Sequence, residues 1–347
     1  MSPYSGNNSQ NIKANSDSWY CLQSPSATAE QTNSTLASPA LSSPSLSLDN
    51  RGLAYADGFF TTMAITDGKI LWADYHWQRL ASHARALQLD IPKPSLLSEL
   101  NCYAKQLQQG VMKVIITRAT QSVRGYCFCT NAEGSACEIW LKIMPANKQT
   151  ISQPIHQAAL RLANDCNITL QPPTTAICLT SQLAWLPPTL AGLKTLNRLD
   201  NVLASGELQR LKMSAVSSLA DTSVIGEGLV RDMTGNWVEG TMSNVFYQLS
   251  TSTTASDYIQ NNAIKNNAHY LTSGQWYTPP MTQSGVAGVM RQVIIDSLSN
   301  TENPVIIRSL PDEDLPKLSQ LFFCNAVRGI MPVTALTLLL GEVVEFN

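Results

Sequence analysis

One lysine in the middle of the chain has surroundings that suit covalent chemistry. Lys194 follows an apolar, glycine-containing stretch, and no carboxylate lies within five residues of it on either side. An amine in a partly apolar pocket loses part of its preference for the ammonium form, so its lone pair can attack a carbonyl carbon. Lys194 is therefore a candidate Schiff-base lysine. The alternative is an ordinary lysine at a strand end, with its stem buried and its charge in water.

Pyridoxal phosphate is a cofactor that uses such a lysine, and it makes three further demands. Its pyridine nitrogen needs a carboxylate, and its phosphate needs backbone N–H groups at a helix start, usually with an arginine. Glu239 stands where a predicted strand meets a small-residue turn, Gly285 and Gly288 precede a helical pattern, and Arg79 lies on an early predicted helix. Each feature alone is common, as a solvated glutamate, a glycine turn or a surface arginine. Their joint occurrence suggests a pyridoxal phosphate site.

The elements that must position these residues fall into two halves. In the first half, two β-rich runs flank Asp67-Gly68, which is typical of a hairpin. Apolar residues at helical spacing predict a helix that stops before Pro92, and strands are predicted at 110–119 and 137–146. This half is predicted to be a small mixed sheet with helices packed on it.

The second half is predicted to be richer in strands. The predicted strands cover 158–163, 174–180, 223–230, 244–249 and the buried run with its turn at 320–336. One predicted helix lies within 285–298. The other follows Lys194, and its apolar stripe is expected to comprise Leu199, Val202, Leu203, Leu208 and Leu211.

The ordered domains have polar neighbours along the chain. Residues 1–47 form a polar extension in which Trp19–Leu22 is a candidate strand, and 146–153 form a polar, proline-bounded linker. The domains expected between and after them are a small N-terminal domain over 48–145 and a large cofactor-binding domain over 154–347. Ser250 to Asn267 is a further polar stretch that we interpret as an inserted loop.

Composition excludes several classes of function. The 347 residues carry a formal charge of −2, and the sequence pI is near 6.1, so nothing favours nucleic acid or an anionic membrane. Eight cysteines and four histidines show no metal-ligand spacing, so we expect no metal site. The amino terminus does not read as a secretory signal and no apolar run is long enough to span a bilayer. We therefore expect a cytosolic enzyme that acts on a small molecule.

Seven motifs resemble those of the class IV (fold type IV) pyridoxal phosphate enzymes, in the family's order. They are NRGLAYADGFFTTM (50–63), HWQRL (76–80), GVMKVIITR with RGY (110–126), GLKTLNRLDNVLA (192–204), EGTMSNVF (239–246), GVAGVMRQ (285–292) and CNAVRGIMPV (324–333). The resemblance covers about Leu48 to Pro332. It implies a two-domain, mixed α+β and α/β fold like that of D-amino acid aminotransferase, with a small mixed α/β domain and a larger β-rich domain with helices.

The resemblance also implies roles for particular residues. Lys194 would form the Schiff base with pyridoxal 5'-phosphate, and Glu239 would pair with the pyridine nitrogen. The residues implied to hold the phosphate are Arg79 and the backbone of Val289 and Met290, with the turn at Asn325 and Ala326 nearby.

Within the family, particular motif residues resemble those of the branch that acts on 4-amino-4-deoxychorismate. Thr61 stands where many transaminases have glutamate, and the KTLNRL and GVAGVMRQ segments are also similar to this branch. Asn50 departs from the family pattern, because it replaces the aspartate of the usual DRG-like motif. This branch implies a lyase that forms p-aminobenzoate and pyruvate for folate synthesis, linked in function to the synthase that supplies its substrate. The alternative is a class IV aminotransferase of the branched-chain or D-amino acid type.

Substrate contacts and assembly are implied by the same resemblance. The loop from Arg124 to Tyr126 is similar to the substrate-facing loop that reaches the neighbouring subunit's active site in relatives, which implies a homodimer. Arg124 and Arg328 are candidate partners for the substrate carboxylates, and Thr61 and Tyr126 are further candidate substrate residues.

Overall fold

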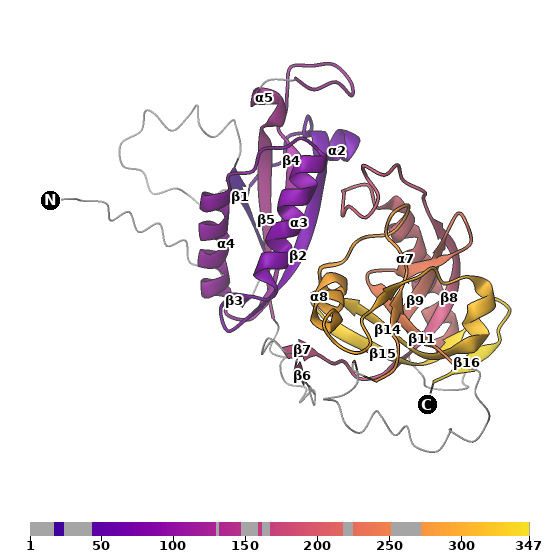
Figure 1. Ribbon diagram of the computed structural model, residues 1–347. Coiled ribbons are helices and arrows are strands. Elements are labelled where there is room, and N and C mark those ends of the chain that lie inside the picture. Colours follow the sequence, from indigo (N-terminus) through magenta and orange to yellow (C-terminus); the bar gives the residue numbers. More distant parts are fainter. Residues whose placement is uncertain are drawn as a thin grey trace, which may run out of the picture. The chain divides into compact units, whose positions relative to one another are not determined.

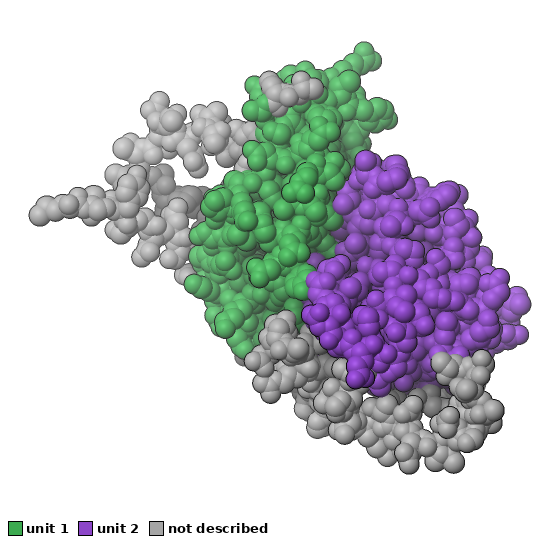
Figure 2. All heavy atoms as spheres, in the orientation of Figure 1, with its two compact units in different colours: residues 1–153 green, residues 154–347 purple. Residues whose placement is uncertain are grey.

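The computed structural model of the chain is shown in Figure 1. It describes residues 17–23, 44–129, 132–146, 159–161, 167–217, 225–250, 271 and 273–346. The chain divides into two compact units, residues 1–153 and 154–347, which Figure 2 colours separately. Most of the polar extension, the predicted linker and the predicted loop after Ser250 lie outside the described residues.

The first unit is built on a five-stranded antiparallel sheet. Its strand order is β1-β5-β4-β2-β3, with β1 at Ser18–Gln23, β5 at Cys137–Pro145, β4 at Gly110–Arg118, β2 at Gly58–Thr66 and β3 at Lys69–Ile70. The predicted hairpin is confirmed, because β2 and β3 are antiparallel neighbours and Asp67 and Gly68 both have positive φ angles. Positive φ at both positions suits the twist of a tight hairpin.

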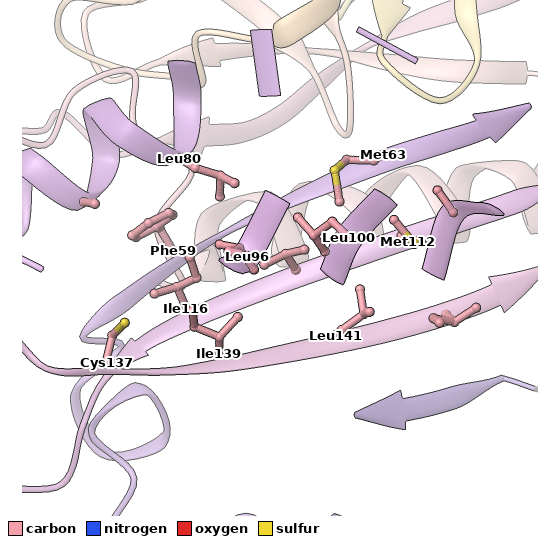
Figure 3. Close-up of a cluster of buried hydrophobic side chains, with 14 of the residues drawn as sticks. Phe59, Met63, Leu80, Leu96, Leu100, Met112, Ile116, Cys137, Ile139 and Leu141 are labelled. Carbon is pink, nitrogen blue, oxygen red and sulfur yellow. The ribbon is translucent and has the colours of Figure 1, made fainter. Parts of the chain in front are cut away.

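Helices α3 (Ala73–Ala86) and α4 (Lys93–Leu107) pack on one face of this sheet. The unit also contains the shorter helices α2 (Arg51–Tyr55) and α5 (Ala132–Ser135). Alternate residues of the strands point to the same face, and Figure 3 shows Phe59, Met63, Ile116 and Leu141 in one cluster with residues of α3 and α4. Helix α4 was not predicted from the sequence, although its buried residues Leu96, Leu100, Ala104 and Leu107 recur at helical spacing.

The second unit is dominated by one large sheet. Its order is β10-β9-β8-β15-β14-β11-β12-β13, and β10 also pairs with β11, so six of these strands close into a ring. The strands are β8 (Thr174–Leu183), β9 (Ile225–Asp232), β10 (Trp237–Gly240), β11 (Asn244–Leu249), β12 (Tyr277–Thr278), β13 (Ile306–Ile307), β14 (Leu318–Asn325), β15 (Gly329–Thr337) and β16 (Val343–Glu345), which pairs with β15. A separate pair consists of β6 (Ala159–Arg161) and β7 (Asn167–Thr169).

The helical segments among the described residues of this unit are α7 (Leu199–Ser217), α8 (Val289–Leu298) and the 3-10 helix η3 (Asp312–Lys317). The predicted fold class is confirmed, since a small α/β unit is followed by a larger β-rich unit with helices. None of the helices among the described residues is both long and apolar enough to cross a membrane.

The predicted orientation of α7 is wrong in its first turns. Leu199, Val202 and Leu203 were expected to face the core, but they are 66%, 61% and 61% exposed. The helix instead buries Ala204 and Leu208 in a cluster with β8 and β9, against which Leu211 also packs. The face that meets the sheet is therefore rotated away from Leu199, Val202 and Leu203.

Candidate active site

The segment that carries Lys194 lies beside the turn that precedes α8. Gly192 forms an isolated parallel bridge with Val286, and its carbonyl accepts a hydrogen bond from the N–H of Ala287 at 2.9 Å. Gly192 has a φ of +75°, and an added Cβ would lie 3.0 Å from the carbonyl oxygen of Met281, so this approach favours glycine. Lys194, two residues further on, is half-buried.

Glu239, near the end of β10, is only 3% exposed. Its Oε2 accepts from the N–H of Val286 at 2.8 Å and from Nδ2 of Asn244 at 3.5 Å, and its Oε1 accepts from Nδ2 of Asn201 at 3.2 Å. Burial raises the pKa of Glu239, and the hydrogen bonds and the nearby charge of Lys194 oppose that rise. The carboxylate is therefore a buried acceptor held by three donors beside a lysine.

Two glycines allow the turn before α8 to approach these groups. Gly285 has a φ of +75°, and an added Cβ would lie 2.8 Å from Val238 Cγ1 and 3.1 Å from Oε2 of Glu239. At Gly288, the N-cap of α8, an added Cβ would overlap the side-chain oxygen of Asn244. No side chain caps the helix. The partial positive charge of its first turn is thus left for another acceptor.

Val289 and Met290, the predicted backbone phosphate ligands, are the first two residues of this helix. Both side chains are buried. The structure therefore brings Lys194, Glu239 and this helix start together within residues 154–347.

The turn between β14 and β15 is joined to the β10–β11 hairpin. Oδ1 of Asn325 accepts from the N–H groups of Val327 and Arg328, at 3.1 and 2.8 Å, and its Nδ2 donates to the carbonyl of Met242 at 3.4 Å. Ala326 follows within the turn. Asn325 thus fixes this turn against the segment that follows Glu239, and the side chain of Arg328 is exposed at its end.

Thr61 and Arg79 belong to the first unit. Thr61 is fully buried on the core face of β2, with its hydroxyl 2.7 Å from Nδ1 of His76. Burial, followed by the charge of Arg79, lowers the pKa of His76 to about 3, and burial lowers the pKa of Arg79 to about 10. His76 is therefore a neutral imidazole at ordinary pH. A substrate contact by Thr61 and a phosphate contact by Arg79 stay predictions.

The loop that contains Arg124 and Tyr126 is held by Arg51. The guanidinium of Arg51 donates to the carbonyls of Gly125 and Tyr126 at 3.4 and 3.3 Å, and its Nε is 2.9 Å from Oδ2 of Asp57. The side chains of Arg124 and Tyr126 are exposed, the latter by 85%. They are available for a ligand, and their part in catalysis stays a prediction.

Asn201, Arg198 and Asn244 contact Glu239 or the lysine segment and were not predicted from the sequence. Arg198 and Asn201 stand three residues apart at the start of α7, a spacing that puts them on neighbouring positions of a helix. The spacing indicates that Arg198 and Asn201 can contact each other, but it does not indicate that Asn201 contacts Glu239.

This set of groups fits pyridoxal phosphate. An amine, a buried carboxylate that favours a protonated partner and an uncapped helix start match the cofactor's aldehyde, pyridine nitrogen and phosphate. Among the described residues, His, Cys, Asp and Glu side chains form no group of three that could hold a metal ion. Fold and site together define a fold type IV enzyme.

Comparison with known proteins gives the family. The sequence profile of the family "Amino-transferase class IV" matches residues 58–336, so the chain belongs to this pyridoxal phosphate-dependent family of aminotransferases and lyases. An aminodeoxychorismate lyase of Vibrio harveyi is 23% identical over 292 residues, which cover 84% of this chain and 87% of that protein.

Solved structures of similar fold agree with this family assignment. The 4-amino-4-deoxychorismate lyase of Pseudomonas aeruginosa has a TM-score of 0.62 and 29% identity, over 88% of this chain and 91% of the other. A hypothetical aminotransferase of Mycobacterium tuberculosis, solved in a PLP-bound form, has a TM-score of 0.61 and 18% identity, over 90% of each chain. The second likeness concerns the fold alone.

Proposed function

We propose that this protein is a pyridoxal phosphate-dependent lyase that converts 4-amino-4-deoxychorismate into p-aminobenzoate and pyruvate, as a step of folate synthesis. The observation that carries the proposal is the placement of Lys194 beside the buried carboxylate of Glu239 and the uncapped start of α8. The choice of this reaction within the family is supported by the 29% identity to the Pseudomonas aeruginosa lyase over nearly the whole of both chains.

The residues that would hold the cofactor follow from the site. The amine of Lys194 would bind its aldehyde carbon, Glu239 its pyridine nitrogen, and the N–H groups of Val289 and Met290 its phosphate, with Arg79 as a further phosphate ligand. Asn325 and Ala326 would border the phosphate. When bound, pyridoxal phosphate supplies an electron sink that stabilises a carbanion next to the substrate nitrogen.

Lys194 has a second task in the proposed reaction. Its amine, once released by the incoming substrate amine, would take the proton from the ring carbon that bears the substrate nitrogen. Departure of the neighbouring enolpyruvyl oxygen then breaks the carbon–oxygen bond, and protonation of the released enol gives pyruvate. Aromatisation of the remaining ring drives the elimination forward. The carboxylate of Glu239 would favour the protonated form of the pyridine nitrogen, on which the electron sink depends.

Substrate contacts and assembly belong to the same proposal. The exposed Arg124 and Arg328 would receive the substrate carboxylates, with Tyr126 and Thr61 as further substrate residues. The protein would act as a cytosolic homodimer, supplied by the synthase that makes its substrate. Light scattering on the purified protein tests the dimer, and a mass equal to one chain contradicts it.

The reaction is tested by generating 4-amino-4-deoxychorismate in the cuvette and assaying both products. We expect p-aminobenzoate and pyruvate in equal amounts, and neither with Lys194→Ala. Substantial lyase activity in Lys194→Ala contradicts the role of the lysine. If the wild type binds the cofactor but yields no product, amino acids with 2-oxo acids are the next substrates to assay, because a class IV aminotransferase would use the same cofactor residues.

A further inference from the structure

Arg198 holds the backbone on both sides of Lys194. Its Nη2 donates to the carbonyl of Leu193 at 2.8 Å and lies 3.2 Å from the hydroxyl of Thr195, while its Nε donates to the carbonyl of Thr195 at 3.3 Å. These acceptors belong to the residues directly before and after the lysine. One planar guanidinium therefore fixes the short non-helical segment that presents the amine.

Asn201 connects this guanidinium to the glutamate. Its Oδ1 accepts from Nη1 of Arg198 at 3.3 Å, and its Nδ2 donates to Oε1 of Glu239 at 3.2 Å. Only one orientation of the amide satisfies both contacts, because arginine can only donate and an ionised carboxylate can only accept. The sequence Arg198–Asn201–Glu239 is thus a directed chain of hydrogen bonds, with Lys194 at one end and the carboxylate at the other.

The electrostatics of this chain favour the ionised carboxylate. Burial disfavours the charge of Glu239, whereas the hydrogen bond from Asn201 and the positive charge of Arg198 both favour it. The two other donors to Glu239, Val286 and Asn244, lie on its Oε2 side. Asn201 donates to Oε1, on the other side of the carboxylate.

We propose that Asn201 is a positioning residue of this active site: it fixes the distance between the lysine segment and Glu239, and it keeps Glu239 ionised so that the pyridine nitrogen stays protonated. The inference rests on the proposed cofactor roles of Lys194 and Glu239. It holds for the lyase and for a transaminase alike, because both need the same protonated ring.

The test compares Asn201→Ala and Asn201→Asp with the exposed Gln209→Ala on the same helix as a control. Loss of a hydrogen bond to a charged group predicts an affinity for pyridoxal phosphate lower by about tenfold or more in Asn201→Ala, since such bonds are among the stronger ones. Asn201→Asp retains the acceptor for Arg198 but places a like charge beside Glu239, so its loss should be larger. Gln209→Ala should bind the cofactor as the wild type does.

A second readout separates positioning from general destabilisation. A less firmly ionised Glu239 leaves the ring nitrogen less protonated and the lysine-bound nitrogen more basic, so the pH midpoint of the visible absorbance of the bound cofactor should rise, more in Asn201→Asp than in Asn201→Ala. A merely structural role would lower thermal stability without moving this midpoint. Equal affinity and equal midpoints in the wild type and in either folded Asn201 variant would overturn the proposal.

Borohydride reduction tests the proposed function separately from the role of Asn201. Reduction should fix the cofactor to the wild-type chain at Lys194, as read by peptide mass, and not to Lys194→Ala. If the wild type carries no fixed cofactor, the proposed function and the role of Asn201 fall together. If it does, while Asn201→Asp behaves like Gln209→Ala, only the role of Asn201 is overturned.

Discussion

Asn50 offers a sharp test of how the first unit is held together. It is 1% exposed, and its Nδ2 donates to Oε2 of Glu138 at 2.7 Å and to the hydroxyl of Thr117 at 3.1 Å. Its Oδ1 accepts from the N–H of Leu53 and so caps α2. An aspartate could still cap the helix, but it would face the carboxylate of Glu138 without a proton to donate. Asn50→Asp therefore changes the contacts that Nδ2 makes with Glu138 and Thr117 and leaves the cap.

The expected loss of stability follows from the short distance between the side chains of residue 50 and Glu138. A hydrogen bond to a charged group contributes about 1.5–3 kcal/mol. Two like charges about 4 Å apart at an effective dielectric constant near 20 repel by about 4 kcal/mol. Uptake of a proton by one carboxyl limits the sum, so we expect Asn50→Asp to lower the free energy of unfolding by roughly 3–5 kcal/mol at neutral pH. The loss should shrink as the pH falls, because protonation of one carboxyl removes the repulsion and restores a donor.

Urea unfolding followed by circular dichroism at pH 7.5 and pH 5 measures both effects. Glu138→Gln in the Asn50→Asp background supplies the missing donor and should recover most of the loss, whereas Asn101→Asp, at an exposed position of α4, should cost little. The reasoning fails if Asn50→Asp is as stable as the wild type at pH 7.5, or if Glu138→Gln does not rescue it. Either result would mean that the contact at 2.7 Å does not carry the energy assigned to it.

Three more outcomes are expected. Gly288→Ala should weaken cofactor binding about a hundredfold in a titration with pyridoxal phosphate, because its Cβ would overlap Asn244. Burial lowers the pKa of His76 from 6.5 to about 3, so between these pH values the folded state binds fewer protons than the unfolded chain. The free energy of unfolding should therefore fall as the pH drops from 6.5 toward 3, and His76→Gln should make this pH dependence weaker. Arg51→Ala should release its loop and speed tryptic cleavage after Arg124 about tenfold, measured by peptide mass, and an unchanged rate would contradict the holding role.

Much of the first unit was predictable because its signals are local. The Asp67-Gly68 turn and the alternating strands are set by residues next to one another in sequence. Helix α4 was missed because Pro92 was interpreted only as the end of the preceding helix. Proline is also tolerated in a first helical turn, where its missing N–H has no partner to lose, and α4 begins with Lys93-Pro94.

The orientation of α7 shows where periodicity fails. Apolar residues occur on more than one side of this helix, so spacing alone could not decide whether Val202 and Leu203 or Ala204 and Leu208 meet the sheet. The sheet selects the face with Ala204, where a small side chain permits close packing against Leu179 and Val230. That choice depends on contacts between residues far apart in sequence, which no local pattern contains.

The site divides in the same way. Lys194 and Glu239 could be singled out because their residue types and neighbours suit a particular chemistry. Asn201 could not, because its importance lies in bridging Arg198 and Glu239, which are far apart in sequence. A polar residue at the start of a helix is ordinary until the strand that carries its partner has been placed.

The energetics of Glu239 connect this preformed network to ligand binding. Burying a carboxylate is costly, and burial raises the pKa of Glu239 although its hydrogen bonds and the nearby charges of Lys194 and Arg198 oppose that rise. A cationic N–H partner at the same carboxylate would lower its pKa again and recover the remaining free energy. Folding therefore prepares an acceptor that is strained by desolvation but fixed in place by Asn201, Asn244 and Val286, and the protonated nitrogen of a bound ring is the partner that such an acceptor favours.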